Sequence, residues 1–289
     1  MFSKALIATD LSAASHTVVC SAAGLKELGA TEAVLLYCFV NTFGDETMAA
    51  QKIMEKAEPA VMEQKKVLEE RGFSVKTKMA MSGSYLEINR QADENECSLI
   101  VVGSSGQAMS KFGGVANSVI HNLSKPALVM RVKLQEEGGT LVCKDCKFDP
   151  FEHVLYATDF SETSEHAFSY VQKISDCGAK RITLMHVQNK ARFESKSDDI
   201  TKEHYRMDSD RLERLKADLE KRGAKQVDIE LPYGLPKEEI VNYTRQHDVS
   251  LVVMGSQGRG IVKEFFLGSV SHSVARYAET SVLLIPPLD

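Results

Sequence analysis

The sequence predicts an α/β protein with two similar domains in tandem, each built on a five-stranded parallel sheet. In the second half, short apolar runs alternate with helical patterns, as in parallel sheets whose faces are covered by helices. The same blocks of sequence occur in the same order in the first half. A glycine-rich loop follows an apolar run in each half, and α/β proteins build phosphate sites from such parts.

Five blocks of the first half recur in the second half in one order, with small changes in length. Residues 5–12 (ALIATDLS) match residues 154–161 (VLYATDFS). The other matched pairs are residues 28–30 and 177–179, 71–78 and 222–230, 98–103 and 250–255, and 113–119 and 268–274. Agreement of five blocks in the same order indicates an internal duplication.

The elements of the second half follow from the spacing of its apolar residues. Apolar runs predict strands near residues 153–158, 181–187, 226–231, 251–254 and 282–285. Helical patterns lie between them, near residues 164–177, 198–222, 236–246 and 269–278. In the longest of these, Leu212, Leu215 and Leu219 recur at helical spacing, which predicts one buried face. Pro236 and the acids that follow it mark a helix start, since both favour the first turn.

Composition narrows the class of protein. A length of 289 residues suits two domains of ordinary size. The net charge is 35 − 40 = −5 without basic blocks, which argues against nucleic acid as a partner. No apolar run approaches the roughly 18–20 residues of a membrane helix, and the first residues show no signal-peptide pattern. Cys20, Cys38 and Cys97 lie in apolar segments, as reduced core cysteines do, so we expect a cytoplasmic protein.

The strongest functional signal is the loop after residues 251–254. It reads Gly255-Ser-Gln-Gly258, then nine residues, then Gly268-Ser269 before a helical pattern. Glycines let the backbone approach a ligand closely, and a helix N-terminus adds partial positive charge. Asp159 follows another strand at the same edge of the sheet, so one crevice is expected to receive both. The loop is not a Walker motif, because Lys263 is misplaced for one.

The Ala157-Thr158-Asp159 start, the Leu184-Met-His-Val187 strand and the G-x2-G-x9-G-S loop resemble the universal stress protein family in its tandem form. The resemblance covers nearly the whole chain except the junction from about residue 133 to 150. It implies Rossmann-like domains, similar to the adenine nucleotide α hydrolases, with strand order 3-2-1-4-5. The domains would span residues 1–133 and 151–289, with residues 134–150 as a linker.

The resemblance also implies an ATP site in the second half, with Mg²⁺. Asp159 would lie by the ribose and adenine, Val187 would offer backbone hydrogen bonds to adenine, and the loop would hold the phosphates. The implied binding residues are Ala157, Thr158, Asp159, Val187, Met254, Gly255, Ser256, Gly258, Arg259, Gly268, Ser269 and Val270.

Some of these residues also have simpler interpretations. Asp159 precedes a helix and is equally consistent with a helix cap. Ser269 at a helix start can be an ordinary N-cap. Arg259 can screen phosphate charge or be a solvated loop arginine. His186, in an apolar strand, is interpreted as a core histidine with satisfied hydrogen bonds and is assigned no chemistry.

The first half departs from the pattern in its glycine loop. Only six residues separate Gly106 from Gly113, against nine in the second half. Gly114 replaces the serine and Gln107 replaces Arg259. We therefore expect this half to be mainly a structural partner, although it could still bind a smaller ligand or bind one more weakly.

Both halves end in a short apolar strand, near residues 127–130 and 282–285. We therefore expect the halves to pair as an internal pseudo-dimer, and a further homodimer is left open.

The junction contains Cys143-Lys-Asp-Cys146, half of a zinc site, which His153 or Asp145 would help to complete. Surface thiols or a redox-active pair are the alternatives.

Taken together, these features predict an ATP-binding stress-response regulator with no assigned catalytic residue. A slow ATP hydrolase or phosphotransferase is the alternative, although Asp159 is the one acid that the sequence places near the site. A nucleotide-free scaffold is a third, if Phe265 or Phe266 fills the site.

Overall fold

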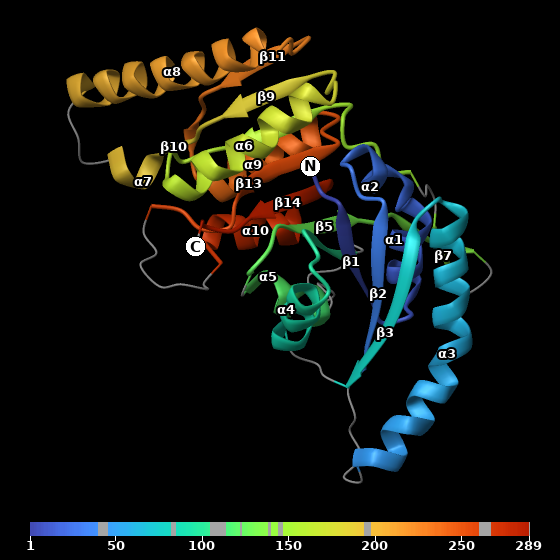
Figure 1. Ribbon diagram of the computed structural model, residues 1–289. Coiled ribbons are helices and arrows are strands. Elements are labelled where there is room, and N and C mark those ends of the chain that lie inside the picture. Colours follow the sequence, from blue (N-terminus) through green and yellow to red (C-terminus); the bar gives the residue numbers. More distant parts are fainter. Residues whose placement is uncertain are drawn as a thin grey trace. The chain divides into compact units, whose positions relative to one another are not determined.

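The computed structural model describes residues 1–39, 46–81, 85–104, 114–121, 123–137, 140–143, 147–193, 198–259 and 267–288. The chain divides into two compact units, Met1–Phe148 and Asp149–Asp289, each with its own sheet and helices (Figure 1). Among the described residues, no helix is long and apolar enough to cross a membrane.

The first unit is a parallel sheet in the order β3-β2-β1-β4-β5. Its strands are β1 (Lys4–Thr9), β2 (Glu32–Phe39), β3 (Ser74–Met81), β4 (Leu99–Ser104) and β5 (Ala127–Arg131). Its helices are α1 (Ala13–Ser21), α2 (Ala23–Glu27), α3 (Glu46–Glu70), α4 (Tyr85–Glu94) and α5 (Gly114–His121).

The second unit repeats this order as β11-β9-β8-β13-β14, again parallel. Its sheet strands are β8 (Val154–Ala157), β9 (Ile182–Met185), β11 (Val227–Glu230), β13 (Leu251–Gly255) and β14 (Ser281–Ile285). Its helices are α6 (Glu162–Asp176), α7 (Lys190–Phe193), α8 (Asp198–Lys221), α9 (Pro236–Gln246) and α10 (Ser269–Tyr277). A small parallel pair joins β10 (Gln188–Asn189) to β12 (Tyr233–Gly234). The α/β class and the order 3-2-1-4-5 are therefore confirmed in each unit.

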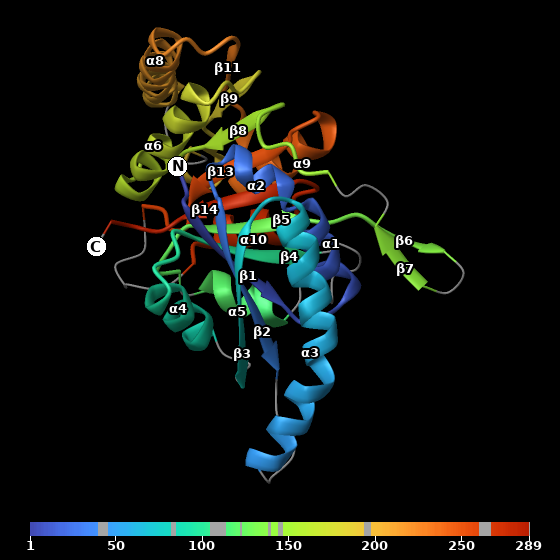
Figure 2. The ribbon, with the colours of Figure 1, turned by 45° about the vertical axis from the view of Figure 1, so that its right-hand side comes forward.

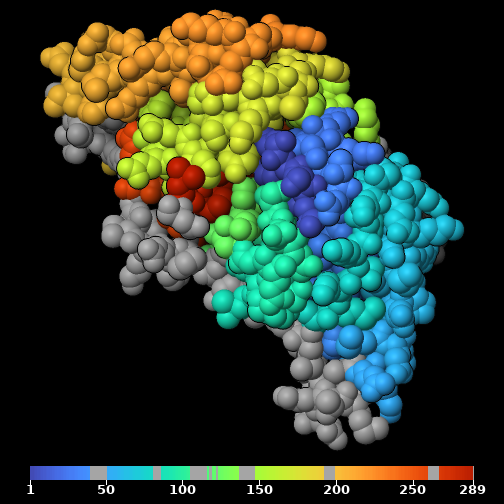
Figure 3. Space-filling view, viewed as in Figure 1, coloured from blue at the N-terminus to red at the C-terminus, as the bar shows by residue number. Residues whose placement is uncertain are grey.

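Helix α8 has the single buried face that its leucines predict. Leu212 and Leu219 are fully buried where the helix packs on β9 and β11, whereas Leu215 is half-buried. The opposite face of α8 is exposed and forms the orange ridge in Figure 3.

Strand register brings the predicted site residues of the second unit to one edge of the sheet. Ala157 at the end of β8 lies opposite Met185 of β9 on one side and Met254 of β13 on the other. All three strands are parallel, so the loops that follow them leave from the same edge. This edge is where α/β sheets bind ligands, and the cavity described below lies there.

The junction that the sequence predicts as a linker contains two short strands. Strands β6 (Leu134–Glu137) and β7 (Thr140–Cys143) form an antiparallel hairpin, which Figure 2 shows as a separate two-stranded ribbon. Cys143 ends β7 opposite Leu134, and Cys146 lies outside the described residues. The hairpin belongs to the first unit.

Candidate functional site

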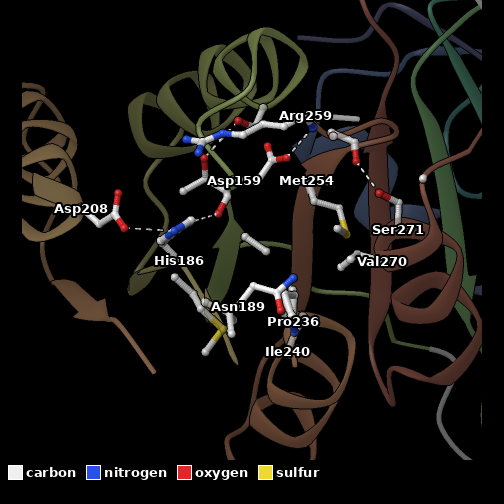
Figure 4. Close-up of a pocket in the computed structure, with 18 of the residues that line it drawn as sticks. Asp159, His186, Asn189, Asp208, Pro236, Ile240, Met254, Arg259, Val270 and Ser271 are labelled. Atoms are coloured by element: carbon white, nitrogen blue, oxygen red, sulfur yellow. Dashed lines mark hydrogen bonds and ion pairs between the residues drawn. The ribbon is translucent and has the colours of Figure 1, made fainter. Parts of the chain in front are cut away.

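A cavity of about 640 Å³ opens at the carboxyl edge of the second sheet (Figure 4). Its wall is formed by the ends of β8, β9 and β13 with the loops that follow them, by helices α8, α9 and α10, and by single residues of α6 and β10. Every residue of the predicted ATP site lines this cavity except Ser256. Further lining residues are Ser164, Met185, His186, Asn189, His204, Met207, Asp208, Arg211, Pro236, Ile240, Gln257 and Ser271.

The turn after β8 is held by hydrogen bonds within its own motif. The Thr158 hydroxyl accepts a bond from the Phe160 amide at 2.9 Å and donates to the Ser164 hydroxyl at 3.0 Å. The Ser161 hydroxyl caps α6 by accepting from the Ser164 amide. These bonds hold Phe160 at φ +58°, which non-glycine residues seldom adopt.

The first unit contains the same turn. Leu11 has φ +61°, its amide donates to the Thr9 hydroxyl, and that hydroxyl donates to Ser15. Ser12 caps α1 as Ser161 caps α6. The duplicated Ala-Thr-Asp-x-Ser motif therefore encodes one strained strand-to-helix turn twice.

Asp159 joins this turn to the glycine loop. One carboxylate oxygen accepts from the Ser161 amide at 3.1 Å and from its hydroxyl at 2.6 Å. The other oxygen accepts from the Arg259 amide at 2.9 Å. A side chain at Gly258 would place its Cβ 2.6 Å from that second oxygen, so this contact requires glycine. The helix-cap interpretation of Asp159 is wrong, because Ser161 is the cap.

Backbone hydrogen bonds of Ser256 hold the glycine loop on the side away from the cavity, and other residues of the loop line the cavity. The Ser256 amide donates to Ile285, and its carbonyl accepts from the Gly268 amide at 2.8 Å. Ser256 is therefore a buried residue whose backbone holds the loop, which explains its absence from the cavity wall. Gly268 is the N-cap of α10 and supplies no capping side chain. Ser269 is the first helical residue and exposed, so its N-cap interpretation is wrong.

One end of the cavity is apolar. Val187, Ile240 and Met254 are nearly buried, and Val270 covers them from the first turn of α10. Figure 4 shows Met254 and Val270 facing each other, with Ile240 below them on α9. This end offers a flat apolar ligand group a place away from water.

The other end of the cavity carries charge from α8 and the glycine loop. The guanidinium carbons of Arg211 and Arg259 lie 5.1 and 5.9 Å from the centroid of the Phe160 ring. Arginines over an aromatic face are held in place and keep their N–H donors available. The side chain of Arg259 therefore lies against Phe160, and its contact with a phosphate stays a prediction.

His186 lies between this charged end and the sheet. Its Nδ1 lies 2.8 Å from the Thr158 carbonyl oxygen, and its Nε2 lies 3.5 Å from Oδ2 of Asp208. Its ring also tilts against Phe160 at 4.5 Å between centroids. Burial lowers the pKa of His186 below its ordinary value, more strongly than Thr158 and Asp208 raise it. The expectation of a core histidine is therefore incomplete, because the ring faces the cavity.

Asp208 and Arg211 are the residues that sequence reasoning missed. Both come from α8, more than forty positions from the Asp159 turn. A signal was present, since Asp208 falls four residues before Leu212 on the stripe that also contains Leu219. An acid on the apolar stripe of an amphipathic helix is unusual and points to a polar wall.

The first unit differs at the corresponding edge. By strand register, Tyr37 of β2 takes the place of His186 and stacks on Phe39, with 5.7 Å between ring centroids. Gly106, Gln107 and Gly113 lie outside the described residues, so the weaker loop of this half stays a prediction.

The zinc site at the junction also stays a prediction. Cys146 and Asp145 lie outside the described residues. His153 is buried in the second unit, where its Nε2 bonds to the Thr183 hydroxyl at 2.9 Å, so it is engaged in the core. Among the described residues, no three histidine, cysteine or acidic side chains are grouped to hold a metal ion by themselves.

Comparison with known proteins identifies both halves. A profile of the universal stress protein family matches residues 1–131 and again residues 150–286. The chain is similar to universal stress protein MJ0577 of Methanocaldococcus jannaschii, at 28% identity over 154 residues, or 47% of this chain and 94% of the relative. It is also similar to universal stress protein YxiE of Bacillus subtilis, at 31% identity over 149 residues, or 47% and 99%.

A solved structure shares the fold. The crystal structure of a universal stress protein from Archaeoglobus fulgidus covers 99% of this chain and 97% of its own, with a TM-score of 0.76 and 23% identity. Since the family profile matches both halves, the chain belongs to the universal stress protein family and carries two of its domains in tandem.

Proposed function

We propose that the second unit binds ATP with Mg²⁺, and that the protein is an ATP-binding regulator of a stress response. One observation carries the proposal. The residues that the sequence motifs predict for an ATP site, drawn from three separate loops, line a single cavity of about 640 Å³. That volume falls within the range of about 300–1,000 Å³ typical of ligand pockets.

The polarity of the cavity matches the two ends of a nucleotide. Val187, Ile240, Met254 and Val270 offer apolar contact to a base. The glycine loop and the N-terminus of α10 also line the cavity, and among the described residues no capping side chain bonds to the first N–H groups of α10. Free N–H groups at a helix N-terminus, together with nearby arginines, suit a polyphosphate.

Asp159 is the proposed ribose contact. Its carboxylate already accepts bonds from Ser161 and from the Arg259 amide, so it is fixed at the cavity wall. A carboxylate oxygen has more than one lone pair, so these bonds leave capacity to accept from a ribose hydroxyl.

Isothermal titration with ATP tests the proposal. We expect one ATP per chain, and ATP at 100 times its Kd should raise the free energy of unfolding by about 2.7 kcal/mol. Gly268→Leu should abolish binding, because its Cβ would lie 3.3 Å from the Ser256 carbonyl and the side chain would fill the phosphate end. Val270→Trp should do so by filling the apolar end.

A matched control comes from the repeat. Val115 is the sequence counterpart of Val270 in the first half, and Val115→Trp should leave the ATP stoichiometry and Kd unchanged. ATP affinity that survives both Gly268→Leu and Val270→Trp would show that this cavity is not the site.

Slow hydrolysis of ATP is the second candidate, and Asp208 favours it. This buried acid gives the cavity wall a second carboxylate beside Asp159. Binding leads because the sequence motifs predict residues that hold a nucleotide and assign no catalytic residue. Phosphate release from bound ATP over hours distinguishes the two. The scaffold alternative depends on Phe265 and Phe266, which lie outside the described residues.

A further inference from the structure

Two hydrogen-bond acceptors face each other at the wall of the cavity. His186 Nδ1 lies 2.8 Å from the Thr158 carbonyl oxygen, which can only accept, so Nδ1 carries the hydrogen. In the neutral ring, Nε2 therefore presents a lone pair. That lone pair lies 3.5 Å from Oδ2 of Asp208, which is a second acceptor.

Both side chains are almost shut off from water. The side chain of His186 is 12% exposed and that of Asp208 is 11% exposed. Among the described residues, Asp208 also contacts Gln188 Nε2 at 3.3 Å and Arg211 Nη1 at 3.8 Å. These contacts are longer than the ~2.7–2.9 Å of a charge-assisted hydrogen bond, so the buried carboxylate is poorly compensated.

We propose that His186 Nε2 and Asp208 Oδ2 are two ligands of a divalent first-row transition-metal cation at the cavity wall. Two neighbouring ligands, each at roughly 2.1 Å from one metal, are separated by about 3.0–3.4 Å, and the two atoms are 3.5 Å apart. A mixed set of imidazole nitrogen and carboxylate oxygen favours such a cation over Mg²⁺, which prefers oxygen ligands alone.

The surroundings of the pair resemble the support that metal ligands receive. A ligating histidine usually donates its other N–H to a carbonyl or carboxylate, as His186 does to Thr158. Gln188 and Arg211 approach different carboxylate oxygens of Asp208, at 3.3 and 3.8 Å. In Figure 4, His186 lies between Asp208 on α8 and the turn that carries Asp159, so the cation would join α8 to the end of β9.

The remaining coordination positions open into the cavity. The described residues supply no third histidine, cysteine or acid in ligand position, so water completes the set. When a nucleotide is bound, its oxygens replace some of that water; this part of the proposal rests on the proposed function. The cation would thereby link nucleotide binding to the position of α8.

Electron paramagnetic resonance with Mn²⁺ as the probe tests the site on the full chain without nucleotide. Mn²⁺ prefers oxygen and nitrogen ligands, so the six cysteines of the chain compete poorly. We expect one Mn²⁺ per chain and nitrogen coupling from an imidazole in the pulsed spectrum. Asp208→Asn and His186→Gln should each weaken Mn²⁺ binding at least tenfold, and His186→Gln should also remove the nitrogen coupling.

Asp210→Asn is the matched control. It removes the same charge from an exposed position on the same helix and should leave Mn²⁺ affinity unchanged. Thermal unfolding of each variant without metal checks that it is folded. Asp208→Asn and His186→Gln change different elements, so one local structural defect would not explain a loss of Mn²⁺ binding in both. The proposal is overturned if the wild type binds no Mn²⁺ without ATP, or if both variants bind it as well as the wild type.

The same proteins separate this proposal from the proposed function. ATP titration in excess chelator measures nucleotide binding without any cation, so it tests the nucleotide site independently of the cation site. If the wild type binds Mn²⁺ but does not bind ATP, the nucleotide site alone is refuted. ATP binding with no protein-bound Mn²⁺ would refute the cation site alone.

Discussion

At the scale of single residues, the contact between Gly258 and Asp159 decides the shape of the site. A Cβ at position 258 would lie 2.6 Å from the Asp159 carboxylate, so a side chain there would displace that carboxylate. That carboxylate holds the glycine loop through the Arg259 amide. Because Gly258 has no Cβ, the Asp159 carboxylate can accept a hydrogen bond from the glycine loop, about a hundred residues further along the chain.

We predict that Gly258→Ala raises the Kd for ATP about tenfold or more. The added Cβ displaces the carboxylate from the Arg259 amide, and a hydrogen bond to a charged group contributes roughly 1.5–3 kcal/mol. Titration of Gly258→Ala, Asp159→Ala and the double variant measures the coupling. If the two effects simply add, the contact is not the cause.

His153 gives a second prediction at this scale. Burial, with a smaller contribution from Arg181, lowers the pKa of His153 below its ordinary value. As pH falls below about 6.5, the unfolded chain binds a proton that the folded unit resists, so the free energy of unfolding decreases. We expect the wild type to lose more stability between pH 7 and pH 5 than His153→Gln does. Urea denaturation at both pH values, followed in each protein, measures the difference; equal losses would contradict it.

At the scale of elements, the two strand-to-helix turns are copies with the same helix cap. Ser12 and Ser161 cap α1 and α6 with the same bond to the amide three residues later. Only Ser161 is seen to hold a carboxylate that reaches across to a glycine loop, through Asp159. The corresponding loop of the first unit lies outside the described residues.

We predict that Ser12→Ala and Ser161→Ala each lower the free energy of unfolding by about 1 kcal/mol, the usual cost of losing an N-cap. Ser161→Ala should also weaken ATP binding several-fold, because Asp159 loses its support. Ser12→Ala serves as the control and should not change it. Calorimetry gives both quantities, and equal effects of the two variants on ATP affinity would contradict this prediction.

At the scale of the whole molecule, each unit has an apolar strand at one edge of its own sheet. Within its unit, β5 pairs with β4 alone, and β14 pairs with β13 alone. Edge strands of this kind expose unpaired backbone groups and need a partner. The sequence predicts that the two halves meet this need for each other as a pseudo-dimer.

Expression of the halves as separate chains, divided between Phe148 and Asp149 so that the β6–β7 hairpin stays with the first unit, tests this prediction. We expect each half alone to aggregate or self-associate, and the two to form a complex when they are mixed. Light scattering after size exclusion measures the masses. Two separate halves that stay monomeric and ignore each other would contradict the pseudo-dimer.

The sequence by itself determined most of the fold and the location of the site. Apolar runs and caps mark elements whose stability depends on nearby residues, so strands and helices of the second half were predicted within a few positions. The duplicated turn and the glycine loop are local motifs, and their spacing identified the residues that line the cavity.

Only the tertiary structure decided what surrounds those motifs. Asp208 faces His186 because α8 is packed on β9 and β11 in one rotation, which the sequence between them does not specify. The Asp159 carboxylate accepts a hydrogen bond from the Arg259 amide, rather than capping a helix, because strand pairing brings β8 beside β13. Such contacts join distant segments through the packing of whole elements, and local spacing contains no record of that packing.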